Sequence, residues 1–149
     1  MPVRVKRVRM KRVYDEPAGS DGTRVLVDRL WPRGLTKERA AVDVWLRDLA
    51  PSDDLRQWFH GHPDGWMSFR KRYLKELARQ ESSDALTELY RLASRRKKLT
   101  LLFASKNEER NNAVVLKDLL EGMRKPPTGT GPAGARTARE RQVKRMPRR

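Results

Sequence analysis

The sequence predicts an α/β fold, a small three-layer sandwich built on a mostly parallel sheet of three to four strands. Short apolar runs, which are typical of buried strands, alternate with longer segments in which apolar residues recur at helical spacing. Strands that are separated by helices pair in parallel through right-handed crossovers. A chain of 149 residues is long enough for one domain with a sizeable core and too short for two ordinary ones.

Two strands are predicted in the first part of the chain. Val3–Val13 alternates imperfectly between valines and cations, which is typical of an edge strand with one face in water. The next segment, Asp15–Gly22, is dense in turn-forming residues. It leads into Arg24–Trp31, where the apolar run Val25–Val27 predicts a buried strand that ends in polar residues.

The middle of the chain predicts shorter elements. Thr36 is placed to cap a short helix through Ala41, and residues 42–46 alternate as a minor strand would. Ser52 then caps a helix, which the segment His60–Pro63 breaks.

The second half predicts three helices and the central strand. Asp64–Gln80 carries its apolar residues at helical spacing, and the next helix begins at Ser82–Ser83. The most continuous apolar run, Leu99–Ala104, is expected of a central strand that is covered on both faces. A final helix is predicted over Asn107–Gly122, with the asparagine as its cap.

Beyond residue 123 the composition changes to proline, glycine and arginine. Such a segment buries too little apolar surface to offset the entropy of ordering it. We therefore expect the α/β domain to span residues 1–123 and residues 124–149 to form a disordered basic tail.

The positive charge is concentrated at the two ends of the chain. Six of the 35 Lys and Arg residues lie in residues 1–13 and nine in residues 122–149, while those two arms hold one of the 19 acidic residues. The middle stretch thus has 20 cations and 18 acids, so most of the formal charge of +16 belongs to the arms. Cationic arms favour contact with a polyanion such as DNA or RNA. The tail residues expected to make that contact are Arg136, Arg139, Arg141, Lys144, Arg145, Arg148 and Arg149.

Several classes of chemistry are excluded by composition. The absence of cysteine removes disulfides, thiolate catalysis and cysteine-bound zinc. No stretch approaches the roughly 18 apolar residues of a membrane span, and no apolar signal region follows the basic N-terminus. We expect a cytoplasmic protein without a membrane partner.

Two polar clusters follow predicted buried strands, at the place where open α/β sheets bind ligands. They are Asp28–Gly34 and Ser105–Asn112. The clusters predict an anion-binding pocket in which Asp28 is the one plausible general base and arginines stabilise negative charge. The expected ligand-binding residues are Arg29, Arg33, Lys106, Asn107, Arg110 and Asn112.

A purely structural interpretation of these residues stays open. Asp28 and Arg29 can form a buried ion pair that closes the sheet, and Asn107 can be only a helix cap. His60 and His62 lie in a predicted loop without further metal-ligand spacing, so we expect exposed histidines and no metal site.

Asp15–Met123 resembles the YeaO-like family, known as domain of unknown function 488. The resemblance covers about three quarters of the chain. It is carried by Lys11–Asp15, Arg24–Leu35, Trp45–Ser52, Trp58-Phe59, Phe69–Tyr73, Leu101–Lys106 and Ala113–Leu116. It implies a small bacterial cytoplasmic α/β domain whose strongest motif is Asp28–Gly34, and it implies no particular reaction.

The chain departs from the family pattern in three places. Family members usually have Gly-His-Asp-Pro where this chain has His60–Pro63. They usually carry histidines where this chain has Arg110 and Asn112. The basic C-terminal extension also lies outside the pattern. If those histidines act in relatives, this chain has lost or altered that activity.

Two functions remain open from the sequence. The first is a protein with an anion-binding pocket at the carboxyl ends of the central strands. Such a protein either only binds a phosphorylated or anionic small molecule or is an enzyme that acts on it. The second is a nucleic-acid-associated accessory protein that binds through its arms, with little sequence specificity because no recognition motif accompanies the charge. Neither function specifies a cofactor or an oligomeric state.

Overall fold

The computed structural model describes residues 8–94 and 98–122 of the chain. Its centre is a four-stranded, all-parallel sheet in the order β1-β4-β2-β3, so the predicted α/β class is confirmed. The strands are β1 (Val8–Arg12), β2 (Thr23–Leu26), β3 (Val44–Trp45) and β4 (Leu99–Phe103).

The strand Leu99–Phe103 is central because it alone is apolar enough to be covered everywhere. All five of its residues are buried, and it pairs with β1 on one side and β2 on the other. The basic strand β1 lies at the edge, as its mixed composition predicts. Residues 3–7 of the strand expected over Val3–Val13 lie outside the described residues. The observed part of this strand is Val8–Arg12.

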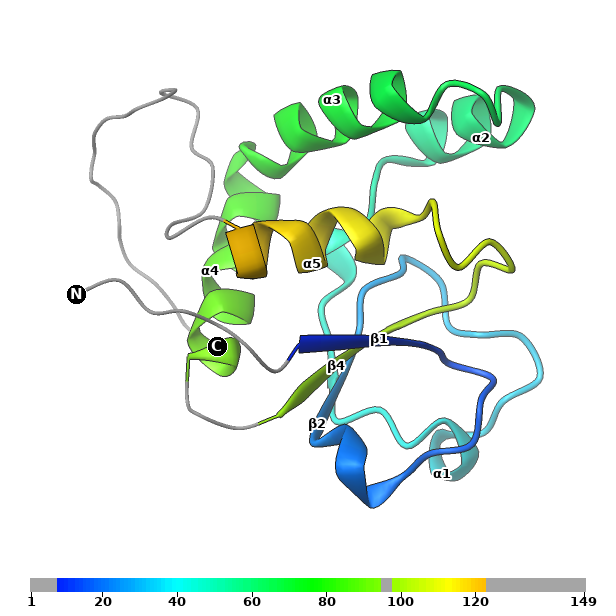
Figure 1. Cartoon of the computed structure of the whole chain (residues 1–149), viewed down its shortest axis with the longest axis vertical. Helices are drawn as coiled ribbons and strands as arrows, with labels where there is room; N and C mark the ends of the chain where they lie inside the picture. The colour runs from blue at the N-terminus through cyan, green and yellow to red at the C-terminus, as the bar shows by residue number, and fades with distance from the viewer. Residues whose placement is uncertain (1–7, 95–97, 123–149) are drawn as a thin grey trace.

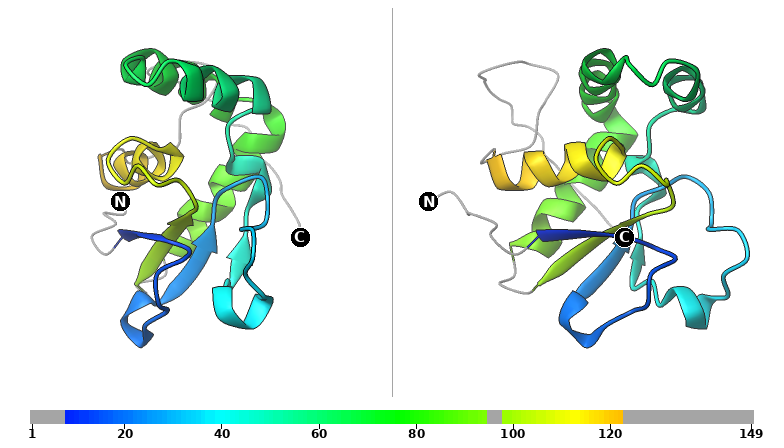
Figure 2. Two further views of the ribbon diagram at one scale, coloured as in Figure 1. Left: turned by 90° about the vertical axis from the view of Figure 1, so that its right-hand side faces the viewer. Right: turned by 45° about the vertical axis from the view of Figure 1, so that its right-hand side comes forward.

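The described residues contain five α-helices, of which α1 to α4 lie between strands in the chain and α5 follows the last strand. Figures 1 and 2 show α2, α3, α4 and α5 on one side of the sheet. A one-turn helix, α1, lies on the other side together with the short 3₁₀ turn η1, whereas a second 3₁₀ turn, η2, contributes Leu49 to the core beneath the longer helices. The bounds are α1 Lys37–Ala40, α2 Asp53–Gly61, α3 Trp66–Leu77, α4 Gln80–Ala93, α5 Asn112–Gly122, η1 Gly19–Asp21 and η2 Arg47–Leu49.

The main core lies between the sheet and the four longer helices. Leu99, Leu101 and Phe103 of β4 point into it together with Val25 of β2. The predicted apolar face of Asp64–Gln80 is confirmed, since its residues Phe69, Tyr73 and Leu77 are buried in α3 and Trp66 and Leu74 pack against the same core. This core fixes the helices above the carboxyl ends of the strands.

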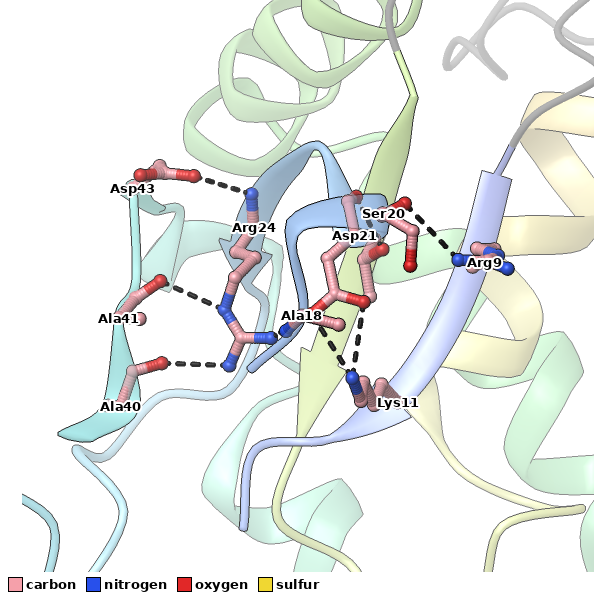
Figure 3. Close-up of polar contacts among 10 residues, drawn as sticks. Arg9, Lys11, Ala18, Ser20, Asp21, Arg24, Ala40, Ala41 and Asp43 are labelled. Carbon is pink, nitrogen blue, oxygen red and sulfur yellow. Dashed lines mark hydrogen bonds and ion pairs between the residues drawn. The ribbon is translucent and has the colours of Figure 1, made fainter. Parts of the chain in front are cut away.

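The opposite face of the sheet has a smaller core and an ionic cluster. Val13, Leu26, Ala40 and Leu102 form the small core. Beside it, Lys11 of β1 and Arg24 of β2 converge on Asp21, as Figure 3 shows. The third layer of the predicted sandwich therefore consists of α1, η1 and connecting loops.

The ionic cluster is buried and fully paired. Asp21 and Arg24 are 2% and 4% exposed, and their side chains are 2.5 Å apart. Arg24 also donates to the carbonyl oxygens of Ala40 and Ala41, which ties the end of α1 to the sheet (Figure 3). Burial alone raises the pKa of Asp21, but hydrogen bonds from Ala18, Lys11 and Arg24 outweigh it and hold this pKa below its usual value.

Two predicted helix starts are wrong, one placed too late in the chain and one too early. The helix expected to begin at Ser82–Ser83 begins at Gln80. The helix expected to begin after Asn107 begins at Asn112. Asn107 instead closes its own turn by accepting from the backbone amides of Glu109 and Arg110. The predicted caps Thr36 and Ser52 are confirmed, because each accepts from a backbone amide three residues later.

The strand expected over Arg24–Trp31 is also shorter than predicted. Its regular part ends at Leu26, although the amide of Val27 still donates to the carbonyl of Leu102. No helix within residues 8–94 and 98–122 has the length and apolar composition needed to cross a membrane. The expected basic tail and the boundary at residue 123 lie outside the described residues.

Candidate ligand site at the carboxyl ends of the strands

Asp28 is the centre of the candidate site and is held by two neutral donors. Its Oδ2 accepts from the backbone amide of Ala104 at 2.8 Å, just after β4. Its Oδ1 accepts from Nδ2 of Asn112 at 3.1 Å, at the start of α5. The same amide nitrogen donates to the carbonyl of Val27 at 2.9 Å. The parallel pairing of β2 with β4 thus brings the two predicted polar clusters together.

The environment of Asp28 favours its neutral form. Burial raises the pKa of Asp28 above its usual value, and the hydrogen bonds from Ala104 and Asn112 and the charge of Arg56 offset only part of that rise. Tyr73 of α3 is fully buried close to this carboxylate and donates its hydroxyl to the carbonyl of Leu49. Burial, together with the charge of Asp28, raises the pKa of Tyr73 well above its usual value.

Asp28 and Arg29 do not form the buried ion pair that the sequence left open. Six ion pairs occur within the described residues, and Asp28 takes part in none of them. The half-buried Arg29 instead carries an unusual group. Its Nε is the one buried side-chain nitrogen or oxygen, among the residues that the structure describes, that lacks a hydrogen-bond partner. Because no described residue supplies an acceptor, a water molecule or an anion can supply one at this position.

The other predicted ligand residues divide into two groups. Asn112 is buried against Asp28, and Asn107 is occupied with its own turn. Arg33, Lys106 and Arg110 have exposed side chains that make no ion pair or side-chain hydrogen bond within the described residues. The structure thus joins Asp28 and Asn112 and leaves these three cations on the surrounding surface.

Two further arginines, which the sequence analysis did not identify, lie at the carboxyl ends of the two outer strands. Arg12, the last residue of β1, donates to the carbonyls of Ala104 and Ser105. Arg47, just after β3, donates to the carbonyl of Arg29 at 3.3 Å. The general rule that ligands bind at the carboxyl ends of parallel strands, applied to all four strands, identifies both residues.

Two surface hollows lie elsewhere in the described residues. One of about 430 Å³ is lined by Arg70, Asp118, Leu119, Glu121 and Gly122. A second, of about 610 Å³, lies along β1 and is lined by Val8, Arg9, Met10, Lys11, Ala18, Ser20, Asp21, Thr100 and Lys117. Neither contains Asp28 or Arg29. Neither hollow is therefore the predicted anion-binding pocket, and the candidate site is defined by its polar groups.

His60 lies on α2 and His62 just after it. His60 and His62 are both exposed, and the ring of His62 stacks on Trp58 with 4.6 Å between centroids. The described residues contain no group of three or more His, Cys, Asp or Glu side chains that could hold a metal ion. The tail cations expected to contact nucleic acid, Arg136 through Arg149, lie outside the described residues.

Comparison with known proteins identifies relatives of this chain. A family model described as "Inactive DUF488-N3 subclade" matches residues 7–132. The chain is 47% identical over 118 residues to the uncharacterized protein YeaO of Escherichia coli, covering 78% of this chain and 98% of that protein. It is 43% identical over 120 residues to the uncharacterized protein Rv3073c of Mycobacterium tuberculosis, covering 80% and 98%. No solved structure matches the chain significantly.

Proposed function

This chain belongs to the DUF488 family, in its YeaO-like inactive DUF488-N3 subclade, and we propose that it binds a phosphate-bearing or other anionic ligand without converting it. The proposed site is the carboxyl edge of the sheet around Asp28 and Arg29. In an α/β sheet this edge is where the loops after several strands present their polar groups to one ligand.

The single observation that carries the proposal is the buried, unpartnered Nε of Arg29. A guanidinium presents its donors in a planar fork that matches the oxygens of phosphate and carboxylate groups. An anion seated at the edge gives this nitrogen the acceptor that the chain does not supply. The exposed cations Arg33, Lys106 and Arg110 add favourable charge around the same edge.

Binding without turnover is supported by the surroundings of Asp28. A general base must release and accept a proton at an atom that reaches the ligand. Here both carboxylate oxygens are tied to Ala104 and Asn112, and the amide of Asn112 does not titrate. The family resemblance implies histidine at this position in most relatives. The amide keeps the hydrogen bond to the carboxylate and removes the proton transfer, which agrees with the name of the subclade.

The test is a thermal-shift titration of the full chain with inorganic phosphate and pyrophosphate. We expect a concentration-dependent rise of Tm, because a ligand that binds only the folded state stabilises it by mass action. The Arg29→Gln variant should lose that rise. Arg79→Gln, which removes an exposed cation at the start of α4, should keep it. Equal shifts for the two variants would contradict the proposal.

The concentration of charge in the arms favours a second function, non-specific binding of DNA or RNA. Fifteen of the 35 Lys and Arg residues lie in the arms, whereas the middle stretch is nearly neutral. Binding through phosphate contacts releases counterions, so the affinity should fall steeply with salt. Changing all the tail arginines and lysines after residue 135 to glutamine should flatten that dependence. No binding of the full chain to a mixed-sequence duplex at about 50 mM salt would contradict it.

A further inference from the structure

We propose that a surface beside Arg29, made of Tyr14, Leu30, Arg33 and Arg47, binds single-stranded nucleic acid. We call these four residues the loop surface. The inference rests on the proposed function in one respect, because it identifies the bound anion as the phosphates of a nucleic-acid strand. It adds a recognition of bases, which neither an anion site nor a cationic tail provides.

The loop surface is held in place by contacts from three strands. The hydroxyl of Tyr14 donates to the carbonyl of Arg33 at 3.0 Å, which ties the end of β1 to the loop after β2. The guanidinium of Arg12 lies over the ring of Tyr14, with its central carbon 5.1 Å from the ring centroid. The same guanidinium donates to the carbonyl of Ser105 after β4. Tyr14 is therefore fixed in orientation although it is part of the surface.

Two tryptophans, Trp31 and Trp45, hold the loop after β2 in place. The indole of Trp31 donates to the carbonyl of Leu35 at 2.7 Å, which closes the loop on itself. Trp31 also packs edge-on against Trp45, with 5.4 Å between their ring centroids. Arg47 lies over the outer side of this pair, 5.0 Å from the Trp45 centroid, and donates to the carbonyl of Arg29. A loop so braced presents its side chains with little ordering left to do on binding.

Large apolar side chains are exposed on this braced surface. Three such side chains are exposed among the described residues, and two of them, Leu30 at 69% and Tyr14 at 41%, belong to the loop surface. The third, Met67 at 72%, lies on α3. An inorganic anion makes no use of exposed apolar groups, whereas a nucleic-acid base can stack on the ring of Tyr14 and make apolar contact with Leu30. A duplex hides its base faces, so the surface fits a single strand.

The charge of the loop suits the phosphates between such bases. Residues 29–37 contain three cations, Arg29, Arg33 and Lys37, and no acid. Acidic residues flank this segment directly in the chain, at Asp28 and Glu38. The loop surface therefore offers few phosphate contacts, and stacking must supply much of its affinity. That balance separates it from the arms, which carry cations and almost no aromatic residues.

The test compares two probes with the same phosphates. Fluorescence anisotropy of the full chain is measured at about 50 mM salt with a single-stranded oligo(dT) of about 12 nucleotides and with an abasic strand of equal length. The arms contact phosphates and treat both probes alike. We expect oligo(dT) to bind about tenfold more tightly than the abasic strand, because each stacked base contributes measurably to affinity.

Matched variants locate the base recognition. Leu30→Ala and Tyr14→Ala should each remove most of the preference for oligo(dT) and leave the abasic affinity unchanged, while Met67→Ala should alter neither. Tyr14→Phe, which keeps the ring, should retain the preference. Equal binding of the two probes by the unmodified chain overturns the inference, as does an effect of Leu30→Ala no larger than that of Met67→Ala.

The same variants separate this inference from the proposed function. If pyrophosphate raises Tm but the two probes bind equally, the anion site stands and the loop surface is refuted. If oligo(dT) is preferred but pyrophosphate has no effect on Tm, the loop surface stands and the separate anion site is refuted.

Discussion

Two carboxylates, the buried Asp21 and the partly buried Asp28, lie at the two ends of β2 and have opposite environments. Asp21 lies two residues before the strand and is paired with the cations Lys11 and Arg24. Asp28 lies two residues after it and is held by neutral amides. The first has a lowered pKa and the second a raised one.

The difference separates a structural cluster from a candidate functional one. Around Asp21 the charges are balanced within the chain. Arg24 also donates hydrogen bonds to two carbonyl oxygens at the end of α1. Around Asp28 the nearby arginine has a buried donor with no partner among the described residues, and the carboxylate makes no ion pair with any of them. Balanced polar groups stabilise a fold, whereas unbalanced ones persist where a ligand completes them.

The largest expected effect comes from breaking the balanced end. Asp21→Asn leaves Arg24 buried without its counter-charge, and we expect the free energy of unfolding to fall by about 3–5 kcal/mol. Urea denaturation measures it. Asp53→Asn breaks an exposed ion pair to Arg56 and should leave the urea midpoint nearly unchanged. A loss for Asp21→Asn no greater than that for Asp53→Asn would show that the cluster does not hold the fold.

A smaller loss is expected at the other end of β2. Asn112→Ala removes two donors, to Asp28 and to Val27, and should cost about 1–3 kcal/mol because their acceptors stay buried. It should also raise the pKa of Asp28 further, since a donor to the charged form is lost. Carboxyl-carbon NMR titration follows that pKa. Asn107→Ala, in an exposed turn, is the control, and an unmoved Asp28 titration in Asn112→Ala would refute the assigned contact.

The two carboxylates should also give opposite pH dependences. Folding raises the pKa of Asp28, so its contribution to stability grows as the pH falls through its folded pKa toward the unfolded value of about 4. Folding lowers the pKa of Asp21, so its contribution is present above about pH 4 and is lost as the pH falls through its folded pKa.

The measurement is the free energy of unfolding of the unmodified chain minus that of Asp28→Asn, followed from pH 7 down to about 4. We expect this difference to rise toward acid. A flat or falling difference would mean that burial does not disfavour the charged form of Asp28.

The smallest stability effect is expected for Arg29→Ala. A buried ion pair with Asp28 predicts a loss of about 3–5 kcal/mol for this change, but that pair does not form. The change also removes the one buried side-chain donor that lacks a partner within residues 8–94 and 98–122. Calorimetry should therefore show Tm within a few degrees of the unmodified chain. A large drop in Tm would restore the structural interpretation of Arg29.

The amino-acid sequence predicted the α/β fold class and the proximity of the two polar clusters that make up the candidate site. The continuous apolar run of β4 predicted a central strand, and parallel pairing placed the polar ends of β2 and β4 together. The caps Thr36 and Ser52 were also predictable, because a cap needs only an amide three residues away. Such features depend on local periodicity and short-range hydrogen bonds.

The tertiary structure alone decided which polar groups meet. Asp28 is bound by Ala104 and Asn112, which lie 76 and 84 residues further along the chain. The segment before α5 offers several asparagines with the same capping chemistry, so the sequence did not distinguish Asn107 from Asn111, whose side chain accepts from the amide of Val114. Which asparagine begins α5 depends on the hydrogen bond that the side chain of Asn112 donates to Asp28. That contact crosses the sheet edge, and no local pattern encodes the partner of a carboxylate when both donors come from distant segments.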